Sequence, residues 1–281
     1  MFNLIRMDMH RLIHSTSAWI VLLFVIVVAV FGVAMTNMDI QATLENPSAA
    51  IEETSSGQQI GISVTADPKW ASGEIEIGDI FSIELSASLL ALLCVIFSAL
   101  FTNAEQKNGY IKNIAGQFPH RGELIASKLF VVAVQVLVML LLFFITVVVS
   151  GYAFWGDKFY LGSMFSVLKV FGTQYLLHLG LSALIMFFCI FTRSTAFGIT
   201  AGILISSNMA APIYMSINKF IADFNPHWDF DISEYVLDGN ITRIAVDSTA
   251  DVISRAVIVG IAFTAVFTAL AMLTIKKRDI R

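Results

Sequence analysis

Long apolar runs alternate with shorter polar stretches along the whole chain. A helix needs about 20 apolar residues to cross the roughly 30 Å apolar core of a bilayer, because each residue advances it by about 1.5 Å. Six segments meet this requirement and carry almost no formal charge: 18–36, 81–102, 127–150, 168–191, 196–216 and 253–275. The pattern predicts an all-α polytopic membrane protein with six transmembrane helices.

The ends of these spans carry a few charged residues. Glu84, Lys169 and Arg255 lie within a turn of a span end, from which a long side chain reaches the headgroups. Arg6 and Arg11 precede the first span as they would precede a secretory signal. The apolar run that follows is longer than a typical signal core, so we expect a retained helix.

The distribution of Lys and Arg predicts the orientation. Eleven of the 17 lie in one alternating set of loops: Arg6, Arg11, Lys107, Lys112, Arg121, Lys128, Arg193, Lys276, Lys277, Arg278 and Arg281. The positive-inside rule therefore places both termini in the cytoplasm. The extracytoplasmic segments are then 37–80, with a possible strand at 60–64, and 217–252, whose mixed aromatic and acidic residues suit the membrane interface.

The first residues have a different pattern. Within 1–17, Phe2, Ile5, Met9, Leu12 and Ile13 fall on one helical face, and polar residues fall on the other. This predicts an amphipathic helix that lies along the inner leaflet before the six-helix domain, 18–281. The alternative is a charged region that only fixes topology.

Composition agrees with a lipid environment. Hydrophobic residues make up 57% of the 281 positions, charged residues make up 14%, and the mean hydropathy is +0.79. Soluble domains carry about 25% charged residues, and disordered chains have low hydrophobicity. Cys94 and Cys189 lie inside apolar runs and form no CxxC motif, so we predict neither a disulfide framework nor a redox site.

Motifs for catalysis are weak. Ser182 lacks the second glycine of a G-x-S-G motif, and His10 and His14 have metal-ligand spacing but no nearby third ligand, so we expect no metal site. The sequence contains no G-x-x-x-x-G-K-[ST] phosphate loop. We therefore expect a chain that is not itself an enzyme, and nothing in the sequence suggests a nucleic-acid partner.

Polar residues inside spans are candidate pathway positions. Gln174 and His178 lie one turn apart near the middle of the fourth span, where polar side chains are often functional. A hydrogen bond between helices is the alternative interpretation. Ser207 and Asn208 are a second pair of polar residues inside a span, the fifth, and are also candidate pathway positions.

The fifth span also carries small residues at four-residue intervals: Ser194, Gly198, Gly202, Ser206 and Ala210. Such a stripe lets two helices approach closely in lipid. The partner helix is either in the same chain or in a second copy.

The loop 103–128 is the most specific feature. Gly109, Gly116 and Pro119 divide it into short pieces, and Tyr110 lies between charges on a surface suited to docking into a partner's groove.

With these motifs the chain resembles the ABC-2 family, the six-span permeases of type-2 ABC exporters. The family's inner loop contains a Glu, a Gly four positions later, an apolar stretch, a Pro with a nearby Arg, and a Lys that opens the third span. The matching positions are Glu105, Gly109, 111–114, Pro119 with Arg121, and Lys128. Lys112 and Asn113 depart from the pattern, since many relatives have leucines there. The stretch 109–114 resembles permeases of Gram-positive bacteria that serve peptide antibiotic efflux or immunity.

The resemblance implies a mechanical role. Segment 105–123 would be a coupling helix, and 217–252 would hold re-entrant half-helices. The ATPase-docking residues would be Glu105, Lys107, Gly109, Tyr110, Lys112, Pro119 and Arg121, with Arg193 in a smaller second contact. Two permease subunits, as a homo- or heterodimer, would each sit on an ATP-binding subunit that holds ATP and Mg, while this chain binds no cofactor.

The inner faces of spans two and five combine serines with many apolar residues and show no buried charge in the sequence. We therefore expect amphipathic or hydrophobic cargo, such as a peptide antibiotic, a toxin peptide or a lipid-like molecule. The alternatives are a membrane sensor or regulatory module and a secondary transporter. Neither internal symmetry nor paired acidic residues in a span support the transporter.

Overall fold

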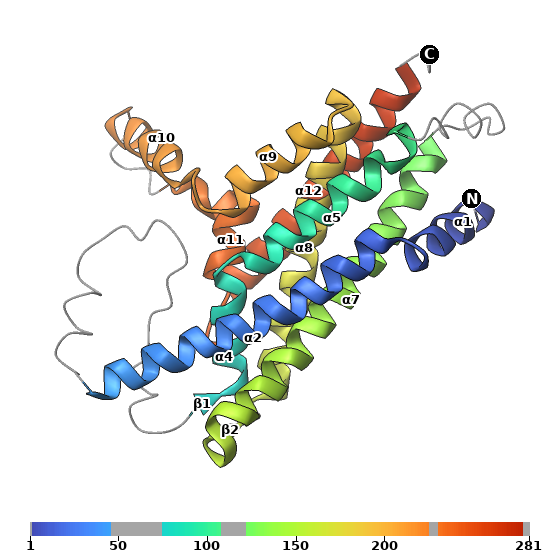
Figure 1. Ribbon diagram of the computed structural model, residues 1–281. Helices are drawn as coiled ribbons and strands as arrows, with labels where there is room; N and C mark the ends of the chain where they lie inside the picture. The colour runs from blue at the N-terminus through green and yellow to red at the C-terminus, as the bar shows by residue number, and fades with distance from the viewer. Residues whose placement is uncertain (1, 46–74, 108–121, 225–229, 278–281) are drawn as a thin grey trace.

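In the residues that the structure describes, the protein is a bundle of helices with one two-stranded sheet (Figure 1). The computed structural model describes residues 2–45, 75–107, 122–224 and 230–277, and the statements below concern these residues. The sheet consists of β1 (Ile75–Glu76) and β2 (Phe159–Tyr160), which pair in parallel with Ile75 opposite Phe159. The predicted strand at 60–64 lies outside the described residues.

Four long helices are continuous and apolar enough to cross a membrane. They are α2 (Thr16–Glu45), α7 (Gly122–Trp155), α8 (Met164–Thr192) and α12 (Ala250–Lys277). All four are free of proline and rich in Leu, Ile, Val and Phe, so each run continues as helix without a backbone interruption. They contain the predicted spans 18–36, 127–150, 168–191 and 253–275.

The other two predicted spans are bent. Segment 81–102 is divided between α4 (Ile77–Ser86) and α5 (Leu89–Lys107), which meet at 55°. Segment 196–216 is divided between α9 (Thr195–Ser206) and α10 (Ala211–Phe224), which meet at 62°. The sequence predicted each segment as one span and did not predict the bend. The described residues contain four to six spans, and the number is six if each bent pair counts as one.

Backbone conformation explains the two breaks. Ser88 and Asn208 have φ values of 60° and 57°, in the left-handed region that a continuing α-helix does not use. Pro212 in the first turn of α10 has no N–H to offer a preceding carbonyl, so it suits a helix start and opposes a continuous span.

Helix α8 is the centre of the bundle. It packs against α5, α7, α9 and α12, and α12 is its most extensive neighbour. The two helices approach closely at glycines: a Cβ added at Gly180 would lie 3.0 Å from the Gly260 carbonyl oxygen. This contact places the small residues of the last span against a helix of the same chain.

Helix α1 (Phe2–Ile13) lies beside the start of α7, at the end of the bundle where the described part of α12 finishes (Figure 1). We call this the α1 end. Trp19 donates a hydrogen bond from Nε1 to the carbonyl oxygen of Ile13, 2.8 Å away, across the turn between α1 and α2. The predicted N-terminal helix is therefore present, and it packs against α7, a contact that the sequence pattern did not predict. Leu4, Asp8 and Leu12 are buried, while Phe2 is 79% exposed.

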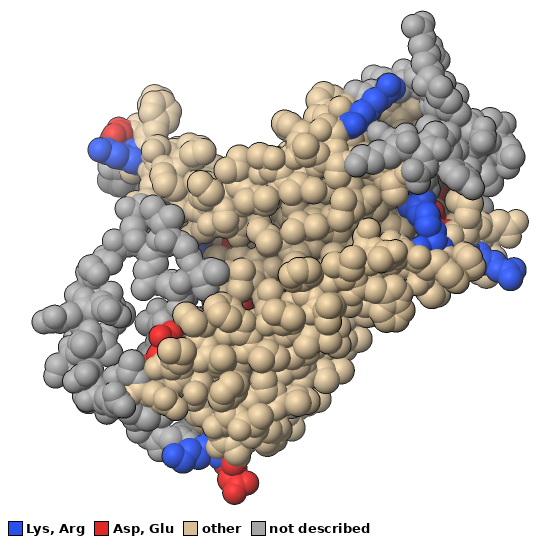
Figure 2. Space-filling model, in the orientation of Figure 1, with Lys and Arg blue, Asp and Glu red and all other residues tan. Residues whose placement is uncertain are grey.

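Between the helix ends, the visible surface of the bundle is largely uncharged (Figure 2). This surface is consistent with helices that face lipid. Beyond α10, η3 (Ile232–Tyr235) and α11 (Leu237–Arg243) connect to α12.

The position of Glu84 shows that two expectations were wrong: that its side chain reaches the headgroups, and that span two has no buried charge. Its side chain does not reach out from a span end, because the residue is only 3% exposed and accepts a hydrogen bond from Thr36 Oγ1, 2.8 Å away on α2. Gly32 of α2 contacts the same carboxyl group, and a Cβ there would overlap it. Span two therefore contains a buried carboxyl group, contrary to the expectation of none, and that group faces α2. Arg255 likewise pairs with Glu234 of η3.

Candidate functional site

The predicted ATPase-docking loop lies mostly outside the described residues. Gly109, Tyr110, Lys112, Pro119 and Arg121 fall in 108–121. Glu105 and Lys107 belong to the last turn of α5, where the structure defines the backbone helix. The described structure therefore provides the two ends of this loop, α5 before it and α7 after it.

Helix α1 contacts the α7 side of the loop through a buried carboxylate. Asp8 is 2% exposed and accepts a hydrogen bond from Ser127 Oγ at 2.6 Å, in the first turns of α7. Lys128, the expected lysine at the opening of span three, is also buried beside Ser127. A buried carboxylate is expensive unless it is paired and hydrogen-bonded, so this contact fixes α1 against α7.

The same helix contacts the α5 side of the loop through Arg11. The guanidinium forms an ion pair with Asp8 at 3.5 Å and donates to the Phe101 carbonyl oxygen at 3.3 Å. Its Cζ atom lies 4.3 Å from the centroid of the Phe101 ring, in cation–π geometry. Helix α1 therefore joins both ends of the loop. The sequence pattern gave Asp8 no role, because the burial of a single carboxylate depends on which helix it meets.

The turn between α8 and α9 is at the same end of the bundle. Arg193 is exposed with a φ of 57°, and Ser194 accepts a hydrogen bond from the Phe197 N–H at 3.2 Å, which caps α9. The sequence correctly places Arg193 in a short turn, and its contact with an ATPase remains a prediction.

The small-residue stripe has partners inside the chain. Gly198 lies against Cys189 of α8 and Ala99 of α5, and Gly202 lies against Val95 of α5 and Ile185 of α8. Ser206 is buried, while Ser194 and Ala210 flank α9 and are half-buried. The stripe thus packs α9 onto α5 and α8, and its use in self-association remains a prediction.

The candidate pathway residues lie in the middle of the bundle. Gln174 and His178 of α8 are both fully buried, and Gln174 Nε2 donates to the Ile241 carbonyl oxygen of α11 at 2.9 Å. His178 Nδ1 lies 2.7 Å from the Gln174 carbonyl oxygen. Ser207 and Asn208, both half-buried, form the break after α9. An interhelical hydrogen bond is thus present for Gln174, while His178 bonds only within its own helix among the described residues.

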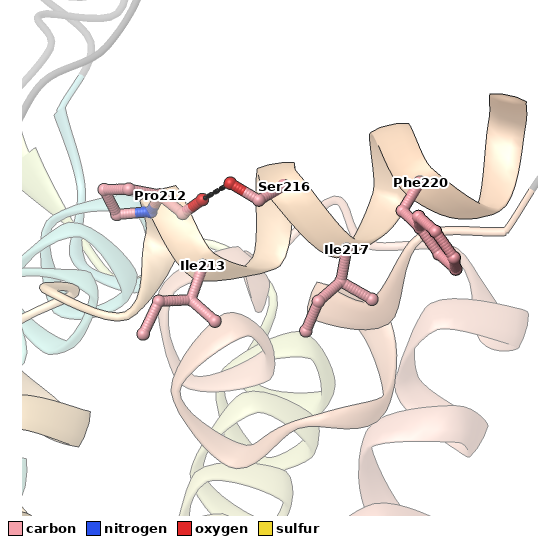
Figure 3. A pocket seen from close by; sticks show the side chains of 5 residues that line it. All are labelled: Pro212, Ile213, Ser216, Ile217 and Phe220. Carbon is pink, nitrogen blue, oxygen red and sulfur yellow. Dashed lines mark hydrogen bonds between the residues drawn. The ribbon is translucent and has the colours of Figure 1, made fainter.

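Helix α10 has no buried residue. Ile213, Ile217 and Phe220 point to the same side and line a hollow of about 420 Å³ together with Pro212 and Ser216 (Figure 3). Asn218 donates from Nδ2 to Asp231 Oδ1 at 2.7 Å, which connects α10 to η3.

The connection before α12 holds a group of charged residues. Arg243 donates to Asp231 and, at 3.3 Å, to Glu234, while Arg255 pairs with Glu234. Partial burial would raise the pKa of Asp231, but hydrogen bonds from Ser233, Arg243 and Asn218 together hold it well below its ordinary value. Burial raises the pKa of Asp238 in α11, against an opposing hydrogen bond from Tyr214. These groups tie the segment after α10 to the bundle.

His10 and His14 stack with ring centroids 4.1 Å apart, and His14 Nδ1 lies 2.9 Å from the His10 carbonyl oxygen. Across residues 2–45, 75–107, 122–224 and 230–277, no three His, Cys, Asp or Glu side chains are grouped as metal ligands.

The comparisons identify the class of protein. Residues 4–207 match the family model described as ABC-2 family transporter protein, a region that runs from α1 through the end of α9. The chain belongs to this family and is a multi-pass permease component of an ABC transporter, a role that implies an ATP-binding partner subunit. None of the curated proteins compared with the chain matches it.

Proposed function

We propose that this chain is the permease subunit of an ATP-driven exporter that moves amphipathic or hydrophobic cargo, such as a peptide antibiotic, a toxin peptide or a lipid-like molecule, out of the cell or the membrane. Its termini lie in the cytoplasm. It works as a homo- or heterodimer with a second permease and two ATP-binding subunits, and these partners hold ATP and Mg. The permease itself is surrounded by lipid, carries no ATPase motif and binds no cofactor.

The observation that carries the proposal is the attachment of α1 to both ends of the loop 103–128. Asp8 contacts Ser127 at 2.6 Å, and Arg11 contacts Phe101 at 3.3 Å, so a force on the loop acts on α5 and α7 together. Helix α5 packs against α8 and α9, so this movement reaches the two bent spans. The sensor and secondary-transporter alternatives give no role to such an arrangement.

The nature of the cargo follows from the interior of the bundle. The buried residues of α5, α8 and α9 are mostly apolar, with polar side chains among them such as those of Ser98, Gln174, His178 and Ser206. Glu84 is buried but faces α2 and is engaged by Thr36. An apolar interior with a few polar, uncharged side chains suits an amphipathic molecule better than a small ion.

The test is co-purification. The tagged chain, expressed with its neighbouring genes, is expected to purify with an ATP-hydrolysing subunit, and Glu105→Arg is expected to abolish this association. Asp157→Arg is the matched control, since it makes the same charge change at an exposed position beyond the other end of α7. An active chain that purifies alone, or an association indifferent to Glu105→Arg, would contradict the coupling role of the loop.

A further inference from the structure

The two breaks in the bent spans lie at one level of the bundle. Gly198 of α9 contacts Ala99 of α5 and Cys189 of α8, and Gly202, one turn later, contacts Val95 and Ile185. Helix α9 therefore runs antiparallel to both α5 and α8. If this register is continued beyond the end of α9, Asn208 lies at the same height along the bundle as Leu89, the first residue of α5, and as Leu179 of α8. The break at Ser88, the break at Asn208 and His178 therefore share one layer, and Figure 1 shows the start of α5 and the end of α9 at the same end of this helix pair.

This layer is near the middle of the membrane-spanning region. His178 is the middle residue of α8, which runs from Met164 to Thr192. Helix α9 has 12 residues, so it covers about 18 Å, roughly half of a bilayer core. Irregular backbone at such depth is tolerated only where protein surrounds it or where it lines a polar cavity.

Several buried polar atoms at this level have no hydrogen-bond partner among the described residues. We call these residues the polar layer: Gln174, His178, Ser182, Ser206 and Ser207. The first three are fully buried, and Ser206 is 3% exposed. His178 and Ser182 share a face of α8 with Ile185 and Cys189, which contact α9, so this face looks toward the end of α9.

The unpartnered atoms have a defined chemistry. A carbonyl oxygen only accepts hydrogen bonds, so His178 Nδ1 must carry the hydrogen that it directs at the Gln174 carbonyl. In a neutral imidazole, Nε2 is then an acceptor. Gln174 Nε2 donates to Ile241, which leaves the Gln174 Oε1 atom as a second acceptor one turn away. The serine hydroxyls both donate and accept, so the layer as a whole can receive a group that donates hydrogen bonds.

Not every hydroxyl of α8 is left without a partner, although buried polar atoms without one also occur elsewhere among the described residues, at Ser98, Gln135 and Thr268. Thr173 and Thr192 each donate to a carbonyl oxygen of their own helix, at 2.9 Å and 2.8 Å. An unsatisfied buried polar group costs about 1–3 kcal/mol, so several at one level are retained only against a substantial penalty.

We propose that the polar layer is an intramembrane binding site for the hydrogen-bond-donating group of an amphipathic cargo molecule, such as a primary ammonium group. His178 Nε2 and Gln174 Oε1 accept its hydrogen bonds, and the hydroxyls of Ser182, Ser206 and Ser207 complete the site. The inference rests on the proposed function and specifies the cargo's polar group. The site is closed in this structure, and a ligand reaches it when one of the two bent spans moves about its break.

The test uses two probes with the same chain and charge. Dodecylammonium has three N–H donors, and dodecyltrimethylammonium has none. The complete permease–ATPase complex in nanodiscs is titrated with each probe, and binding is read from the rise of the unfolding temperature. We expect dodecylammonium to bind the wild-type complex at least about tenfold more tightly, because a site built to accept hydrogen bonds rejects an analogue that lacks the donors. This preference should disappear in His178→Phe and weaken in Ser182→Ala.

Thr173→Val is the matched control, because it removes a buried hydroxyl of α8 that is already satisfied within its own helix. It should leave the preference unchanged. Equal affinities of the two probes for the wild type would overturn the proposal, as would a preference that survives in both His178→Phe and Ser182→Ala.

Ser182→Ala removes only one oxygen, so it keeps the test decisive if His178→Phe fails to fold. The binding assay requires no ATP hydrolysis. Loss of the ATPase subunit during purification would count against the proposed function, and the isolated chain would still test the polar layer.

Discussion

The Asp8–Arg11 pair at the α1 end and the residues of the polar layer differ in whether the fold satisfies their buried polar atoms. Asp8 and Arg11 contact Ser127, Phe101 and each other across three helices. His178 and Ser182 each have a buried atom without a hydrogen-bond partner in the described parts of the chain. A satisfied group holds helices in place, whereas an unsatisfied one weakens the resting fold. The first region therefore serves architecture and transmission, and the second is the better candidate for binding.

The largest effect is expected at Asp8. Asp8→Ala leaves Ser127 and Arg11 without their buried partner, and removal of one member of a buried pair costs about 3 kcal/mol or more. The complex should lose roughly 6–12 °C in unfolding temperature, measured by a thermal melt in detergent. Asp8→Asn keeps an oxygen for Ser127 and should lose less. An unchanged melt in Asp8→Ala would remove the distinction between the two regions.

Gly32 and Glu84 test a satisfied group inside a span. In Gly32→Ala the new Cβ overlaps the Glu84 carboxyl group, which Thr36 prevents from moving aside. We expect a loss of about 1–3 kcal/mol from this overpacking. The double variant with Glu84→Ala should recover part of it, as a double-mutant cycle in thermal melts would measure. Additive effects would show that the two residues do not interact.

The Asp231 group provides a smaller, pH-dependent effect. Because the pKa of Asp231 is lowered in the folded state, the unfolded chain binds more protons around its ordinary pKa. The stabilisation is therefore present above that ordinary value, about 3.9, and is lost as the pH falls toward the lower folded value. Thermal melts should show a shallower loss below pH 5 in Asp231→Asn than in the wild type. The effect is modest because the Arg243 side chain is 43% exposed and solvent screens the pair. An identical acid profile would contradict the assignment.

Ser182→Ala should have the smallest effect on stability. Its hydroxyl has no hydrogen-bond partner among the described residues, so its removal should leave the unfolding temperature unchanged or slightly raised. Thermal melts without added probe provide the measurement, with Thr173→Val as the comparison. A marked loss of stability would show that the resting protein already satisfies this group.

Much of the fold follows from apolar run lengths, because crossing a bilayer imposes a minimum on each span. The continuous helices α2, α7, α8 and α12 were predictable for this reason. The breaks at Ser88 and Asn208 were not, since the runs stay apolar across them and the bend depends on two left-handed residues. Candidate residues on α8 and α9 were found from their polarity. The importance of Asp8 and Glu84 was missed, because burial of a single carboxylate depends on which helix it meets.

The sequence by itself determined that this is a multi-pass α-helical membrane protein with an N-terminal helix, a small-residue stripe and two pairs of polar residues in its spans. It also carried the motifs of the ABC-2 family. These properties are local, since they follow from residue type and spacing. The tertiary structure decided that the stripe packs against α5 and α8, that α1 joins both ends of the loop, and that the two breaks share a layer with His178. Contacts between distant segments set these features, and a hydrogen bond is satisfied or missing only once the helices have packed.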